Sequence, residues 1–169
     1  MGLRAAPFRI LGIDPGSRAT GYGVIDKNGH SLTFVACGVI RATPRASLPA
    51  RLREIYDGVS EVIVTHQPAK AAVENVFVSV NAMSALKLGH ARGVILLALI
   101  QQGLEVREYS PRPIKQTVAG YGQAAKAQVQ HMVRAMLSLS ATPSQDAADA
   151  LAVALCFASH WRPAGGMQP

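Results

Sequence analysis

Apolar and β-branched residues dominate the first forty positions of the chain. Residues 8–13 (FRILGI) are almost continuously apolar, which is typical of a strand buried on both faces. Residues 20–26 and 30–42 are rich in β-branched and aromatic side chains, and the Asn28-Gly29 pair between them favours a tight hairpin turn. The pattern therefore predicts three strands joined by short connections at the start of the chain.

After residue 46 the pattern changes to helices that alternate with strands. Helical spacing of apolar residues covers 47–67, 84–103, the two halves of 111–139 on either side of Gly120, and the stretch from Thr142 to about Trp161. Residues 69–77 and 104–110 read as strands between these helices. For the last helix, Thr142 and Gln145 fit a capping box with Pro143 at the first helical position.

This order of elements predicts an α/β fold with a five-stranded mixed sheet, three antiparallel strands followed by parallel strands, flanked by helices. The sequence contains no internal repeat and no linker, so we expect one domain over residues 1–162 and a flexible tail over 163–169. The longest apolar run, residues 94–100, follows Lys87, His90 and Arg92 in the same predicted helix. A core or interface helix is therefore expected there, not a membrane span.

The cysteines and the N-terminus indicate a compartment. Cys37 and Cys156 have no metal-ligand spacing and give no reason to expect a disulfide. The first ten residues lack the apolar core of a signal peptide. We expect a cytoplasmic protein that does not bind a membrane.

Charge adds information about partners. Seventeen Lys and Arg residues against ten Asp and Glu residues give a net charge of +7, which suggests a polyanionic partner. No acidic residue lies between Glu108 and Asp146, where Arg112, Lys115 and Lys126 are found. On charge alone, a solvated basic face and a phosphate-binding surface explain this stretch equally well.

The acidic residues are few and their positions are unusual. Asp14 ends the first predicted strand, Glu74 falls late in an apolar strand, and Asp146 and Asp149 share one face of an almost wholly apolar helix. Each position has an ordinary explanation: a turn for Asp14, a sheet edge for Glu74, and the helix dipole for the two helical acids. Those explanations do not account for all four together.

Neighbouring strand ends in an α/β sheet open into a common crevice. Four carboxylates converging there would repel one another unless divalent cations lay between them. Oxygen ligands without His or Cys suit Mg²⁺ or Mn²⁺. The Gly-rich stretch after Asp14 is not a nucleotide phosphate loop, because Tyr22 and Gly23 stand where that motif needs Lys and Ser or Thr.

Six motifs, in this order and spacing, closely resemble the RuvC family of Holliday junction resolvases: ILGIDPGSRATGYGVI, VENVF, SALKLGHARGV, IKQTVAGYG, KAQVQHMV and DAADALAVA. The resemblance covers roughly residues 8–160. It implies a ribonuclease-H-like fold and a homodimer that resolves four-way DNA junctions by paired symmetric cuts with Mg²⁺ or Mn²⁺. It also implies a partner, the branch-migration complex of junction-binding and motor ATPase subunits.

Carried over motif by motif, the resemblance assigns the site. It implies that the metal-binding, catalytic carboxylates are Asp14, Glu74, Asp146 and Asp149. Lys115 and Lys126 match essential basic positions, and Phe77 matches an aromatic residue that engages junction bases. Together with Arg112, these three residues form the expected DNA-binding set. The implied chemistry resembles two-metal phosphodiester hydrolysis, with two ions per site.

Two other functions compete with this interpretation. The stretch GIDPGSRATG is also similar to the phosphate loop of actin-like phosphotransferases, but those proteins contain two such domains and need a much longer chain. A junction-binding module without catalytic activity is the second. The complete acidic set argues against it, and a metal-dependent nicking assay separates the two.

Overall fold

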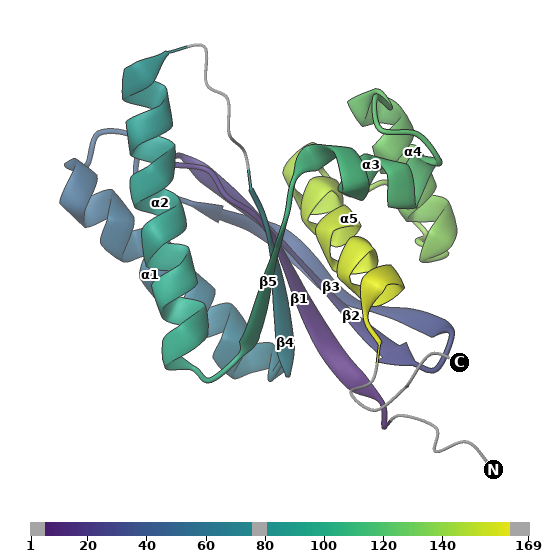
Figure 1. Ribbon diagram of the computed structural model, residues 1–169. Coiled ribbons are helices and arrows are strands. Elements are labelled where there is room, and N and C mark those ends of the chain that lie inside the picture. Colours follow the sequence, from purple (N-terminus) through teal and green to yellow (C-terminus); the bar gives the residue numbers. More distant parts are fainter. Residues whose placement is uncertain (1–5, 76–80, 163–169) are drawn as a thin grey trace.

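A twisted five-stranded sheet forms the centre of the computed structural model, which describes residues 6–75 and 81–162 (Figure 1). The strands are β1 (Phe8–Asp14), β2 (Ala19–Asn28), β3 (Ser31–Arg41), β4 (Lys70–Glu74) and β5 (Glu105–Tyr109). Their order across the sheet is β3-β2-β1-β4-β5. The first three strands pair antiparallel, whereas β4 and β5 run parallel to β1. The predicted mixed sheet is confirmed.

Helices cover both faces of this sheet. They are α1 (Leu48–His66), α2 (Ala82–Gln101), α3 (Pro111–Ala119), α4 (Lys126–Met136) and α5 (Gln145–His160). Figure 1 shows α1 and α2 on one face and α5 on the other, with α3 and α4 packed outside α5. Successive residues of β1 serve the two layers in turn: Ile10 packs with the α5 layer and Leu11 with the α1–α2 layer. The continuously apolar β1 is therefore a consequence of two buried faces.

Helix α5 lies unusually close to the sheet because glycines line the strands beneath it. A Cβ atom at Gly12 would stand 2.2 Å from the Ala150 carbonyl oxygen, and one at Gly21 would stand 2.0 Å from the Asp146 carbonyl oxygen. Only glycine permits this approach of backbone to backbone. Residues 147, 148 and 150–158 of α5 are buried, as expected for a helix that is apolar nearly all round.

The start of α5 differs from the sequence prediction. Ser144, not Thr142, caps the helix, and its Oγ accepts a hydrogen bond from the Ala147 N–H at 3.4 Å. The carbonyl of Pro143 accepts instead from the Gln130 side chain of α4, at 2.6 Å, and the helical ladder begins two residues later than predicted, at the Ser144 carbonyl. Asp146 lies in the first turn of α5 and Asp149 in the second, although both were expected in the first.

One side of α2 packs in the core and the other is an exposed apolar stripe. Ala91, Ile95, Ala98 and Leu99 are buried against the sheet and α1. Met83, Leu86, Leu97 and Ile100 are 50–60 % exposed. By length and composition alone α2 could cross a membrane, with a mean hydropathy of 1.5, but its opposite side belongs to the folded core. This arrangement agrees with the predicted core or interface helix.

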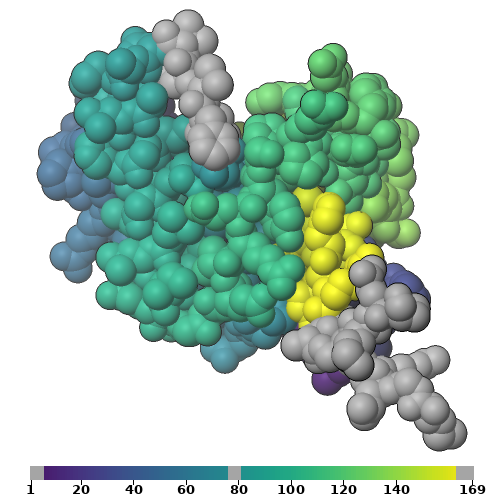
Figure 2. All heavy atoms as spheres, in the orientation of Figure 1, coloured from purple at the N-terminus to yellow at the C-terminus, as the bar shows by residue number. Residues whose placement is uncertain are grey.

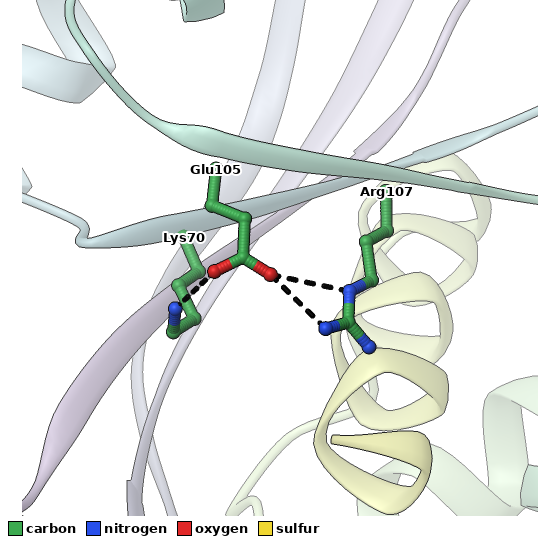
Figure 3. A network of polar contacts seen from close by, with 3 residues as sticks. All are labelled: Lys70, Glu105 and Arg107. Carbon is green, nitrogen blue, oxygen red and sulfur yellow. Dashed lines mark hydrogen bonds and ion pairs between the residues drawn. The ribbon is translucent and has the colours of Figure 1, made fainter. Parts of the chain in front are cut away.

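The amino ends of β4 and β5 are joined by ion pairs (Figure 3). Glu105 accepts from Lys70 and from Arg107, whose Nη2 lies 3.1 Å from Glu105 Oε1. The Lys70 ammonium also lies over the Trp161 ring, and the Arg107 guanidinium lies over the Phe157 ring of α5. These contacts fasten the last turns of α5 to one end of the sheet. The acidic residues singled out from the sequence lie at the other end.

Candidate active site

Asp14 and Glu74 lie side by side because their strands are parallel neighbours. The β1–β4 register pairs Ile13 with Val73, and each acid is the next residue along its strand. Both strands point their carboxyl ends toward the space between α2 and α3 (Figure 1). The Glu74 carboxyl group lies close enough to Asp14 to raise the pKa of Asp14. The predicted meeting of two strand ends is confirmed.

Helix α5 brings the other two acids to the same place. The negative charges of Asp14 and Asp146 both act on Asp149, and the charge of Asp146 also acts on Asp14. Residues three apart lie on one face of a helix, which is why Asp146 and Asp149 turn together toward the ends of β1 and β4. All four acidic residues predicted from the sequence are therefore neighbours in the structure.

A pocket of about 270 Å³ opens at this point. Its charged lining is Asp14, Glu74, Asp149, Lys115 and Lys126, whereas Asp146 lies outside it. Apolar walls come from Pro111, Ile114, Val129 and Ala152. In the space-filling view, α2 and the α3–α4 pair rise as two lobes with a notch between them (Figure 2).

Sequence reasoning did not identify the apolar walls of this pocket. The spacing of residues in the sequence nevertheless indicates these walls. Val129 follows Lys126 by three residues, and Ala152 follows Asp149 by three, which places each apolar residue on the same helical face as its charged neighbour.

Burial and mutual repulsion change the acidity of the cluster. Desolvation, followed by the hydrogen bond to and charge of Glu74, raises the pKa of Asp14 from 3.8 to about 8. Desolvation and the charge of Asp14 raise the pKa of Asp149 to about 6, although Lys126 and Lys115 act in the opposite direction. The carboxylates thus share a site in which their full negative charge is unfavourable without an added cation.

The basic residues of the site come from α3 and α4. Lys126, the first residue of α4, places its Nζ 4.0 Å from Asp149 Oδ2, and Lys115 on α3 also lines the pocket. Arg112 is exposed on α3, outside the pocket lining, and packs near Gly122. Phe77 lies outside the described residues. The structure therefore brings both predicted lysines to the carboxylates, but not Arg112.

The carboxylate cluster suits a divalent cation by its chemistry. Asp14, Glu74 and Asp149 offer hard oxygen donors in one pocket, where burial and neighbouring negative charge raise the pKa of Asp14 and of Asp149. Within residues 6–75 and 81–162, no three His, Cys, Asp or Glu side chains already stand close enough to hold a metal ion.

One further contact reaches this site from α2. Arg92 Nε donates to the Glu74 carbonyl oxygen at 3.3 Å, and Arg92 Nη2 lies 2.7 Å from Glu108 Oε1. Arg92 could not be singled out from the sequence, because a lone arginine in an amphipathic helix carries no distinguishing pattern.

The raised pKa values predict how stability depends on pH without metal. From about pH 4 the folded state holds protons that the unfolded chain has released, on Asp149 up to about pH 6 and on Asp14 up to about pH 8. The free energy of unfolding should therefore fall as pH rises through this window. We expect the melting temperature in EDTA to drop by several degrees between pH 5 and pH 8, and by clearly less in Asp14→Asn. Parallel melting curves for the two proteins would contradict the shared cluster.

Comparison with known proteins identifies the family of this chain. Residues 10–157 match the family described as Crossover junction endodeoxyribonuclease RuvC. Proteins of that name from Burkholderia mallei and Halorhodospira halophila are 57 % and 55 % identical to the chain. The alignments cover 89 % and 90 % of this chain and 83 % and 90 % of those proteins.

A solved structure extends this agreement to the fold. It is that of Thermus thermophilus RuvC in complex with a Holliday junction substrate, with a TM-score of 0.83 and 36 % identity. The match covers 89 % of this chain and 93 % of that one, so the sheet and its helices correspond nearly throughout. This chain therefore belongs to the RuvC family of crossover junction endodeoxyribonucleases, whose fold is ribonuclease-H-like.

Proposed function

We propose that this chain is a structure-selective endonuclease that resolves four-way (Holliday) DNA junctions by paired symmetric phosphodiester cuts in recombination and repair. The observation that carries the proposal is the pocket in which Asp14, Glu74 and Asp149 meet Lys115 and Lys126. Membership of the family, and the junction bound by its Thermus relative, supply the substrate class. The net charge of +7 supports a polyanionic substrate.

In this proposal the ligands of two Mg²⁺ or Mn²⁺ ions are Asp14, Glu74, Asp146 and Asp149. When bound, the ions supply Lewis-acid activation of water and stabilise the leaving oxygen. Asp14 contacts Glu74 on one side and feels the charges of Asp146 and Asp149 on the other, so it is the shared member of the set. The backbone approach at Gly21 holds the Asp146 end of α5 against the sheet.

The lysines act on the phosphate itself. Lys126 and Lys115 line the pocket on the side of α3 and α4, where their positive charges face the place that the scissile phosphate would occupy. Their role is to stabilise the additional negative charge of the transition state. Arg112, exposed on α3, contacts DNA phosphates outside the pocket, and Phe77 contacts junction bases.

We further propose a homodimer whose two-fold axis passes near α2. Along α2, Met83, Leu86, His90, Gly93, Leu97 and Ile100 follow one another at alternating intervals of three and four residues. This spacing gives a straight seam, apolar at both ends with His90 and Gly93 at its middle, of the kind that pairs two helices. One chain carries one site, and two opposed cuts need two sites related by symmetry.

The seam gives a direct test of the dimer. Leu97→Glu should weaken the dimer at least about tenfold, because a carboxylate would be desolvated on both sides of the two-fold axis. Val64→Glu, on α1, is the matched control, since Val64 is an apolar residue that is 61 % exposed and belongs to another helix. Sedimentation equilibrium measures both. A wild-type monomer at micromolar concentration, or equal behaviour of the two variants, would contradict the dimer.

The remaining partners follow from the family assignment. We propose that the dimer works with the branch-migration complex, the junction-binding and motor ATPase subunits, in the cytoplasm on chromosomal DNA. The single domain over residues 1–162 would contain all the catalytic groups.

A cleavage assay tests the function. The protein is incubated with a four-way junction, a duplex and a single strand of the same sequence, each with Mg²⁺, Mn²⁺ or EDTA. We expect cleavage of the junction alone, and only with a divalent cation. Tight junction binding without cleavage under every condition would favour the non-catalytic binding module instead.

A further inference from the structure

The carbonyl group of Glu74 lies just beyond the end of a hydrogen-bonded ladder. Pairing between β1 and β4 ends at Ile13 and Val73, so β1 offers no ladder partner to the residue that follows. On the opposite side of the strand, the Asn75 N–H donates to the Tyr109 carbonyl oxygen at 2.8 Å and keeps β4 joined to β5. The β1 side of Glu74 needs another donor, because a partly buried carbonyl without a partner is costly.

Arg92 supplies that donor. Its Nε lies 3.3 Å from the Glu74 carbonyl oxygen, and its Nη2 lies 2.7 Å from Glu108 Oε1 on β5. The Arg92 side chain is only 17 % exposed, so its contact with the Glu74 carbonyl is partly shielded from solvent, whereas the Glu108 side chain is 39 % exposed. The planar guanidinium fixes the two donors relative to each other, and Glu108 thereby orients the nitrogen that reaches Glu74.

We propose that Arg92 is a positioning residue for Glu74, which it holds at the pocket by fixing the backbone at the end of β4. The proposal rests on the function proposed above. Arg92 does not line the pocket and acts only through Glu74 and Glu108. Because Arg92 belongs to α2, it also ties the helix with the apolar seam directly to the strand that carries a site carboxylate.

A matched control exists at the other end of the sheet. Arg9 also bridges a carboxylate and a backbone carbonyl: its Nε lies 2.8 Å from Asp26 Oδ1, and its Nη1 donates to the His66 carbonyl oxygen at 2.8 Å. The Arg9 side chain is 33 % exposed. Arg92→Gln and Arg9→Gln therefore remove similar contacts, but only the first removes one from a residue of the site.

The experiment compares wild type, Arg92→Gln, Arg92→Lys and Arg9→Gln. Mn²⁺ binding to the DNA-free protein is measured by electron paramagnetic resonance, and the single-turnover nicking rate is measured at saturating junction and metal. For Arg92→Gln we expect Mn²⁺ affinity or nicking rate to fall about 10- to 100-fold, as is typical when a group that supports a metal ligand is lost. Junction binding in EDTA should stay within about twofold of wild type, since the phosphate contacts are unchanged.

The other variants separate positioning from stability. Arg9→Gln should lower the melting temperature about as much as Arg92→Gln while Mn²⁺ binding and nicking stay within about twofold of wild type. The Mn²⁺ affinity and nicking rate of Arg92→Lys should lie between those of wild type and Arg92→Gln, because an ammonium cannot reproduce both donors of the planar guanidinium.

Three results would overturn the proposal. The first is unchanged Mn²⁺ binding and nicking in Arg92→Gln, and the second is an equal loss of both in Arg9→Gln. If Arg92→Gln does not fold, the test passes to Arg92→Lys. The third contradicting result is then a wild-type Mn²⁺ affinity in Arg92→Lys. A wild type that binds Mn²⁺ but cuts no junction would refute the proposed function alone, because Mn²⁺ binding still tests Arg92.

Discussion

Asp14→Asn should lower the rate of junction nicking by about 10³-fold or more. Metal-assisted stabilisation of a phosphoryl transition state is worth several kcal/mol, and each 1.4 kcal/mol corresponds to a factor of ten. Asp14 interacts electrostatically with Glu74 and with both acids of α5, so removing its charge changes the metal-binding potential of the whole cluster. We expect losses of similar size in Glu74→Gln and Asp146→Asn. Single-turnover nicking assays at saturating metal measure them.

The same variants should keep their affinity for junction DNA. Asparagine and glutamine nearly match the shape of the acids they replace, and removing like charges from a crowded pocket relieves repulsion. In EDTA, gel shifts should show binding as tight as wild type or slightly tighter. Asp57→Asn, an exposed acid on α1, is the control for the loss of one negative charge and should leave nicking unchanged. Loss of junction binding together with loss of nicking would show that these acids have a structural role and not a catalytic one.

Lys126→Ala should lower the nicking rate by about 10²-fold at saturating junction. The loss of one preorganised donor to a developing negative charge typically has this size. The Lys126 ammonium lies 4.0 Å from Asp149 Oδ2 and lines the pocket, so its charge stands where the phosphate would react. Because this stabilisation develops in the transition state, affinity for the junction should fall much less than the rate. Lys115→Ala should behave in the same way.

Arg162→Ala provides the comparison for the lysines. Arg162 follows the far end of α5, where its side chain contacts the Ser159 and Trp161 carbonyls, away from the pocket. Its removal takes away one positive charge with nearly no effect on the rate at saturating DNA. Equal rate losses in Lys126→Ala and Arg162→Ala would mean that the lysines only bind DNA phosphates and do not stabilise the transition state.

The strands and the two strand-end acids could be predicted because their signals are local. Continuous apolar runs identified β1 and β4, and parallel strands necessarily bring Asp14 and Glu74 to one edge. The close approach of α5 could not be predicted in this way. It depends on Gly12 and Gly21, which in the sequence look like ordinary members of a Gly-rich stretch.

Features that depend on packing between distant elements were missed or misplaced. The predicted start of α5 was wrong because Gln130, on α4, donates a hydrogen bond to the Pro143 carbonyl. With the predicted cap, that carbonyl would have accepted a hydrogen bond within the helix. Arg92 was missed because its partners, Glu74 and Glu108, lie on two strands that are distant from α2 in the sequence. The lysines were placed by family resemblance, since only the packing of α3 and α4 on α5 brings them to the acids.

Product analysis on a supercoiled plasmid that extrudes a cruciform tests the central claim most directly, because it separates paired cuts from single ones. If two symmetric sites cut within one binding event, wild-type protein with Mg²⁺ or Mn²⁺ should give mainly linear plasmid, with matching nicks on opposed strands of the junction. Asp14→Asn should give neither linear nor nicked product. Accumulation of nicked circles without linear product, or cutting that persists in EDTA, would contradict a metal-dependent enzyme that resolves junctions by paired cuts.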